Sequence, residues 1–135
     1  MKKLTTLLAL SLALSTAACS QTVKFRPSTV APAAQAEVSI SNDNHGNAIV
    51  KLKVKHLASP SSLTPPRAAY VVWAGSVDGR LANLGAITVD KNLSASMTTT
   101  APFGDFSIFI TAEDSPTMSY PTGVRVLETG PIKTK

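Results

Sequence analysis

Apolar and polar residues alternate with a period of two along much of the chain. The clearest case is residues 48–56, where three aliphatic side chains alternate with three lysines (Val50, Leu52 and Val54 with Lys51, Lys53 and Lys55). Successive side chains of a β-strand point to opposite faces, so this segment predicts a strand with one buried face and one charged face.

Clusters of Gly, Pro, Asn, Asp and Ser separate seven segments that are alternating or continuously apolar, which is typical of a small all-β domain. We find no segment after residue 18 with helical spacing and caps. We therefore expect an antiparallel, immunoglobulin-like β-sandwich of about seven strands over residues 36–131. The predicted strands cover residues 37–41, 48–56, 69–74, 81–89, 93–98, 106–111 and 124–128.

The segment from Ala69 to Ala74 is almost entirely apolar rather than alternating. Such a run indicates a central strand that is covered on both faces. It contains the single tryptophan, Trp73, which we expect near the centre of the core between the two sheets.

The first 18 residues have the layout of a secretory signal peptide. Met1-Lys2-Lys3 is a positive start, an apolar run begins at Leu4, and small residues precede Cys19. A membrane-spanning helix needs about 20 apolar residues, and this run is shorter. We therefore predict an exported protein that is cleaved after residue 18.

Thr16-Ala17-Ala18-Cys19 resembles the lipobox of bacterial lipoproteins, although that motif usually has an aliphatic residue in place of Thr16. The resemblance implies a lipid attachment site at Cys19, with acyl chains holding the protein to a membrane of the cell envelope, on its periplasmic or outer side. Ser20 resembles the sorting signal for the outer membrane where two membranes exist. The alternative is ordinary cleavage, which would leave one free thiol on a secreted protein.

Residues 19–35 contain Pro27 and Pro32 and show no clear periodicity. We expect a flexible tether that holds the domain roughly 20–25 Å from the lipid.

Composition excludes several classes of protein. One cysteine rules out an internal disulfide framework. The net charge of +5 falls to +3 without Lys2 and Lys3, and no dense basic cluster with aromatic residues is present, so we expect no nucleic-acid partner.

The cluster Asn42–Asn47 predicts a hairpin turn rather than a calcium loop, because it lacks the ligand order and closing Glu of such loops. The two histidines, His45 and His56, lack the spacing and partners of a metal site. We predict no metal, no cofactor and no catalytic residue. A small secreted hydrolase is kept as an alternative, because a Ser-His-Asp triad can be assembled from distant residues.

Two surface features have open interpretations. The lysines at 51, 53 and 55 indicate either a solvated face that discourages edge-to-edge aggregation or a contact with an anionic surface. The loop Asp114–Tyr120 is either a binding tip or a simple connection.

Several short pieces between Ala69 and Val126 resemble the extracytoplasmic C-terminal domain of anti-sigma-K factors. They are Ala69–Trp73, Asp78-Gly79, Leu84–Ile87, Phe109–Glu113 and Pro121–Gly123. The loop between Glu113 and Pro121 departs from the Gly-Gly-Ser stretch usual in that family.

The resemblance implies a β-sandwich module with a sensing or binding role. It does not imply sigma-factor inhibition, because the cytoplasmic domain and membrane helix of those proteins do not fit in this chain. We therefore expect a non-enzymatic binding, sensing or structural protein of the envelope, with an accessory role in envelope signalling and a protein partner as one hypothesis. The alternative is a structural or adhesive lipoprotein that contacts cell-wall polymer.

Overall fold

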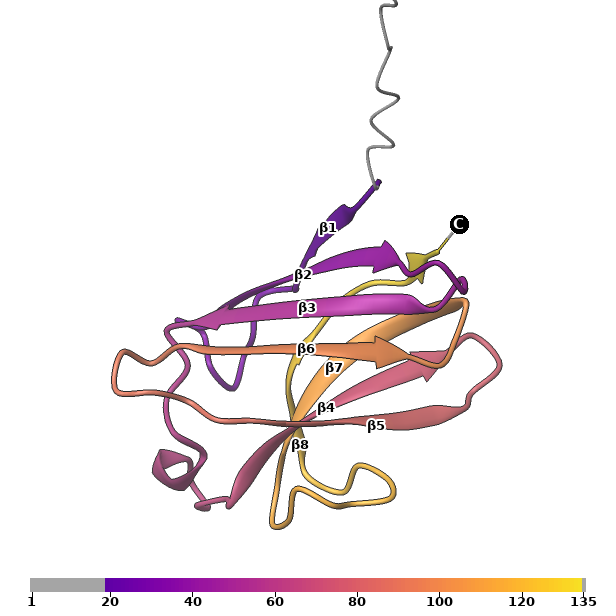
Figure 1. Cartoon of the computed structure of the whole chain (residues 1–135). Helices are drawn as coiled ribbons and strands as arrows, with labels where there is room; N and C mark the ends of the chain where they lie inside the picture. The colour runs from indigo at the N-terminus through magenta and orange to yellow at the C-terminus, as the bar shows by residue number, and fades with distance from the viewer. Residues whose placement is uncertain (1–18, 135) are drawn as a thin grey trace, which may run out of the picture.

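A computed structural model describes residues 19–134, which form two antiparallel sheets packed face to face (Figure 1). The predicted signal peptide, residues 1–18, lies outside the described residues. Within residues 19–134, no helix is long and apolar enough to cross a membrane.

Residues 19–134 form nine strands and one short 3-10 helix. They are β1 (Gln21–Lys24), β2 (Gln35–Asn42), β3 (Ala48–Lys55), η1 (Pro60–Ser62), β4 (Ala69–Ser76), β5 (Leu81–Ile87), β6 (Ala95–Ala101), β7 (Asp105–Glu113), β8 (Val124–Glu128) and β9 (Ile132–Lys133). The first sheet has the order β1-β2-β3-β6. The second sheet has the order β5-β4-β7-β8, and β9 pairs with β7.

All seven predicted strands are present as β2 to β8, so the prediction of an all-β antiparallel sandwich is confirmed. The chain crosses between the sheets after β3, after β5 and after β6, which gives the interleaved order of immunoglobulin-like sandwiches. The strands β1 and β9 are additions that the sequence pattern did not indicate.

The strand β3 lies inside the first sheet, between β2 and β6, and its residues alternate between the buried and the exposed face. Val50, Leu52 and Val54 are at most 1% exposed and pack into the core, while the lysines between them face solvent. The strand pairs with β2 on one side and β6 on the other. Shifting this register by one residue would bury the lysines, so the pattern itself determines the pairing.

The structure differs from the flexible tether expected over residues 19–35. Residues 21–24 form β1, which pairs with β2 so that Val23 lies opposite Val38. The Phe25 amide donates to the Ala36 carbonyl at 2.9 Å, and the Arg26 amide donates to the Glu128 carbonyl at 2.8 Å. Val23 and Phe25 pack against the core, so apolar burial outweighs the chain entropy that would favour a free segment.

Trp73 is fully buried, but it does not lie between the sheets as expected. Tyr70, Val72 and Ala74 face the inter-sheet core, whereas Val71 and Trp73 face the opposite side of the second sheet. There they pack with Phe109, whose ring centroid is 6.4 Å from that of Trp73. The apolar run therefore did predict a strand covered on both faces, and the correction concerns which face holds the tryptophan.

The pairing of β1 predicts slow amide exchange in a segment that would exchange freely in a tether. We expect the Phe25 and Arg26 amide protons to exchange at least about tenfold more slowly than that of Lys91, which lies in an exposed turn. Hydrogen exchange followed by NMR measures this directly. Equal rates at the three positions would contradict the pairing.

Candidate functional site

Cys19 is exposed and lies two residues before β1. It borders a cleft of about 330 Å³ together with Ile40, Asn42 and Lys133. The Gln21 side-chain amide donates to the Lys133 carbonyl at 2.7 Å, which links the start of β1 to the C-terminal strand. Cys19 therefore lies beside the C-terminal segment, and Figure 1 shows β1 and the C-terminus at the same side of the molecule.

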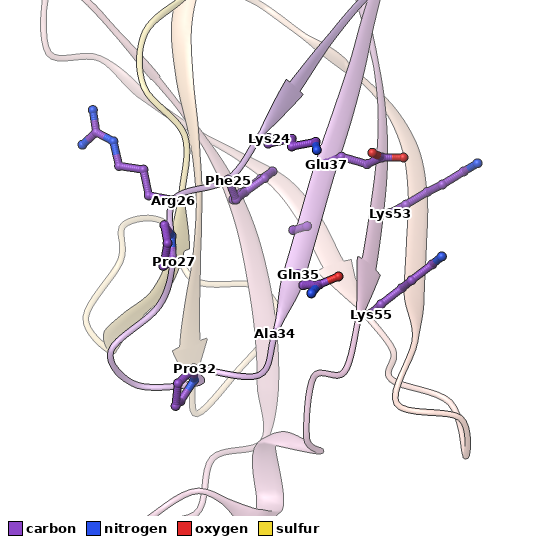
Figure 2. A pocket seen from close by; sticks show the side chains of 11 residues that line it. Lys24, Phe25, Arg26, Pro27, Pro32, Ala34, Gln35, Glu37, Lys53 and Lys55 are labelled. Carbon is purple, nitrogen blue, oxygen red and sulfur yellow. The ribbon is translucent and has the colours of Figure 1, made fainter.

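Four lysines gather on the solvent side of the first sheet. We call this the lysine face, and it consists of Lys24 on β1 and Lys51, Lys53 and Lys55 on β3. Pairing sets Lys24 opposite Glu37 and Glu37 opposite Lys53, so one acidic side chain lies between two lysines in a cross-strand row. In the close-up, Lys53 and Lys55 extend in the same direction away from the strand (Figure 2).

The position of β3 changes the interpretation of its lysines. An edge strand gains protection from aggregation when it carries lysines, but β3 is hydrogen-bonded on both sides. Edge protection is therefore not the reason for this stripe. Within residues 19–134 the four ion pairs all use arginines, which leaves the ammonium groups of the lysine face to solvent.

A cleft of about 500 Å³ borders the lysine face, where the segment after β1 curves beside the sheet. Lys24, Lys53 and Lys55 contribute to its wall, and Glu37 is its only acidic residue. Arg26 also lines it, but its side chain points away from β3 and pairs with Glu128 at 3.7 Å (Figure 2). The cleft is open and positively charged, which suits an anionic group and not a cation.

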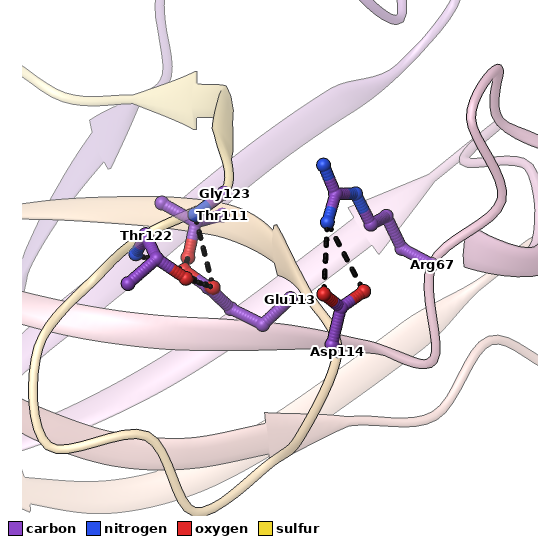
Figure 3. A network of polar contacts seen from close by, with 6 residues as sticks. All are labelled: Arg67, Thr111, Glu113, Asp114, Thr122 and Gly123. Atoms are coloured by element: carbon purple, nitrogen blue, oxygen red, sulfur yellow. Dashed lines mark hydrogen bonds and ion pairs between the residues drawn. The ribbon is translucent and has the colours of Figure 1, made fainter.

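The buried carboxylate of Glu113 organises the other end of the molecule (Figure 3). It accepts hydrogen bonds from the Thr111 hydroxyl at 2.5 Å, the Thr122 hydroxyl at 2.8 Å and the Gly123 amide at 3.0 Å. Burial alone would raise the pKa of Glu113, but these donors outweigh it and hold the pKa below its ordinary value. The side chain is therefore a charged structural acceptor and not a proton donor.

The same hydrogen-bond network also includes Trp73, which packs with Phe109 on the outer side of the second sheet. Thr111 also accepts a hydrogen bond from the Trp73 indole at 2.8 Å. Gly123 approaches the backbone of β7 so closely that a Cβ at this position would lie 1.7 Å from the Ala112 carbonyl oxygen. Only glycine fits there, which explains the residue type at position 123, directly before β8.

The loop Asp114–Tyr120 covers the outer cluster of the second sheet, which consists of Val71, Trp73 and Phe109. Met118 packs against it, and the Asn83 side-chain amide donates to the carbonyls of Pro116 and Met118. Arg125 lies over the Phe109 ring, with its guanidinium carbon 4.0 Å from the ring centroid. Pro116 and Met118 therefore hold the middle of the loop against the second sheet, while Tyr120 at its end is 65% exposed.

The Asn42–Asn47 cluster forms the predicted turn between β2 and β3. The Asp43 carboxylate accepts bonds from the His45 and Asn47 amides and from the Asn47 side chain, and the side-chain bond from Asn47 contributes most to lowering its pKa. His45 lies before β3 and His56 follows it, so the two histidines are at opposite ends of that strand. Among the described residues, no three His, Cys, Asp or Glu side chains converge as metal ligands.

Sequence reasoning missed Glu113 and Lys24 as members of these arrangements. Thr111 and Glu113 are polar residues two apart at the end of an apolar strand, and that spacing was the available signal for a buried polar pair. Lys24 joins the lysine face only because β1 pairs with β2, which the tether interpretation concealed.

Comparison with known proteins adds no relative: no family model, no curated protein and no solved structure matches this chain.

The Glu113 network predicts a specific destabilisation. Glu113→Gln keeps the shape of the side chain but replaces one carboxylate oxygen by an NH2 group. This new donor would face the donors of Thr122 and Gly123, so their hydrogen bonds would be lost. We expect the free energy of unfolding to fall by about 1–3 kcal/mol, measured by urea denaturation at pH 7. Asp114→Asn is the matched control, because its carboxylate is 77% exposed and its ion pair contributes at most about 1 kcal/mol.

The difference in unfolding free energy between wild type and Glu113→Gln should also depend on pH. Because the native-state pKa of Glu113 is lowered, its stabilising effect is complete above the ordinary glutamate pKa of about 4.3 and is lost as the pH falls through the native value. The stability gap between wild type and Glu113→Gln should therefore shrink in acid. A gap that is constant down to pH 2 would show that the charge is irrelevant.

Proposed function

We propose that this protein is a lipid-anchored component of the bacterial cell envelope, whose β-sandwich acts as a non-enzymatic binding or sensing module. Acylation of Cys19 would hold it on the outer side of a membrane. A structural or adhesive role on cell-wall polymer is the alternative within the same placement.

The observation that carries the proposal is the position of Cys19. The chain's only thiol is exposed and directly precedes the first strand, so acyl chains on it would meet no steric obstacle from the fold. An exported protein with one unpaired thiol is unusual, and acylation explains why the residue occurs there. Each buried methylene of an acyl chain contributes about 0.8 kcal/mol to membrane binding, so two or more chains hold the protein stably.

The sensing role draws its support from the resemblance to anti-sigma-K factors. All of the pieces that carry it lie in the second sheet or its turns, on β4, β5 and β7 and before β8. Two of these pieces bond to each other, because Glu113 accepts from Thr122 and Gly123. The resemblance therefore concerns one connected unit of the fold, and a module of this type would bind a partner outside the cytoplasm.

The ends of the sandwich would then have separate roles. The loops around η1, between β5 and β6, and between β7 and β8 lie at the end opposite Cys19 (Figure 1). An anchor at Cys19 would direct these loops away from the anchor point, where a partner has access. Leu93 and Tyr120 are exposed apolar side chains in two of them, and they are the residues we would test first for partner contact.

Metabolic labelling tests the anchor. In cells given an alkyne-tagged fatty acid, we expect the label on the wild-type protein and its recovery in the detergent phase after phase partitioning. The Cys19→Ser variant should carry no label, and this loss of label is the decisive result because an uncleaved signal peptide could still hold the variant in the detergent phase. Ser20→Ala, one residue away, is the control and should be labelled like the wild type.

A wild-type protein with an unmodified Cys19 in intact-mass spectrometry would overturn the proposal. So would accumulation of the precursor in the cytosol. Either result would favour a soluble secreted or intracellular protein with a free thiol.

A further inference from the structure

We infer that the lysine face is a docking surface for anionic lipid headgroups, and that it lays the first sheet against the membrane to which Cys19 is anchored. This inference rests on the proposed anchor for its geometry in the cell. The affinity of the face for anionic lipid is measurable without the anchor.

The first support is the charge of the face. Lys24, Lys51, Lys53 and Lys55 project from the outer side of the first sheet, and all four are exposed. Glu37 is the only acidic residue on the four strands of this sheet, and the other outward positions are mostly hydroxyl or amide side chains, including Ser39, Ser96 and Thr98. Asp90, in the loop between β5 and β6, borders the face because it lines a cleft with Lys53 and Lys55. From strand geometry, the four lysine stems fall within an area of roughly 10 by 13 Å.

The second support is where the other acidic groups lie. Asp43, Asp78 and Asp105 are in or beside turns at the end that carries Cys19, so contact through that end would bring carboxylates to an anionic surface. Asp90 and Asp114 are at the opposite end, and Asp90 also borders Lys53 and Lys55 there. Charge complementarity therefore selects the flat side of the first sheet and not either end of the sandwich.

The third support is continuity with the anchor. Cys19 leads through Ser20 into β1, which is an edge strand of this same sheet. An acyl chain on Cys19 would hold that edge at the lipid surface, and rotation about Ser20 would bring the lysines down to the headgroups. Docking then becomes an intramolecular step, so a few lysines suffice without a high affinity in solution.

Anionic wall polymer presents similar charges, but it has no such continuity with the anchor. The anchor holds the face within reach of the bilayer at all times. We therefore assign the lysine face to lipid, and polymer binding is an outcome that the test can detect.

The test is flotation with vesicles, using the mature chain from residue 19 with Cys19→Ser, so that neither the apolar signal segment nor an acyl chain contributes. The probes are vesicles of 30% phosphatidylglycerol in phosphatidylcholine and vesicles of phosphatidylcholine alone. Each lysine near an anionic surface contributes about fivefold to the partition coefficient. Replacing Lys51, Lys53 and Lys55 by Gln should therefore lower anionic-vesicle binding by about a hundredfold.

The matched control removes three positive charges elsewhere, with Arg80, Lys91 and Lys133 replaced by Gln. It has the same net charge, and we expect its binding to change by less than about threefold. Glu37→Gln removes the acidic residue of the face and should increase binding by about fivefold, a gain that a misfolded protein would not give. Trp73 fluorescence verifies that each variant is folded.

Three results would overturn the inference. The first is an equal loss of vesicle binding in the two triple variants, and the second is equal binding of the protein to anionic and neutral vesicles. The third is stronger binding to dissolved polyglutamate than to anionic vesicles, which would assign the face to a polymer. If Cys19 proves unacylated in cells while the vesicle results hold, the proposed anchor fails and the lipid affinity of the face remains.

Discussion

The pairing of β1 with β2 is the contact on which the arrangement of this molecule depends. It places the start of the folded domain at residue 21, two residues after the only thiol. It also adds Lys24 to the side of the sheet that already presents three lysines from β3. Without this strand, Cys19 would end a mobile tether and the lysines would have no fixed relation to it. With it, the charged surface and the strand that follows Cys19 belong to one sheet, and only Ser20 separates the anchor point from that sheet.

A second constraint acts on the other sheet. The strand β4 is apolar on both faces, so the second sheet needs a cover on its outer side as well as the first sheet on its inner side. The chain meets this need with the loop after β7, and the Glu113 carboxylate draws the return of that loop against β7 through donors from Thr122 and Gly123. A charged group is thus used where an apolar residue could not bind backbone amides, and its hydrogen bonds offset the cost of burial.

The strands with strong alternation or long apolar runs were predictable from sequence alone, because burial on one or both faces leaves a period that can be recognised. The strand β1 was not, since four residues hold too few alternations to distinguish a strand from a polar linker and Pro27 follows closely. The position of Trp73 was also beyond the sequence. A run such as Tyr70–Trp73 indicates two covered faces but not which element covers each one.

The candidate site was likewise predictable only in part from the sequence. Cys19 and the lysines of β3 were identified from their local pattern, whereas their common sheet required the long-range pairing of β1. The Glu113 network required knowledge that residues 122–123 return to β7, which only the folded chain supplies.

Paramagnetic relaxation measured from a nitroxide on Cys19 tests the central claim most directly, because this single thiol can be labelled without any substitution in a chain that starts at residue 19 and is produced without acylation. If β1 fixes the label to one end of the sandwich, the amide signals of Ile40–Asn42 and Lys133–Thr134 will broaden, while those of η1 and Asp114 stay sharp. The two ends are about 26 Å apart, the length of an eight-residue strand. Broadening spread over both ends would show that Cys19 moves on a flexible tether and would contradict the account.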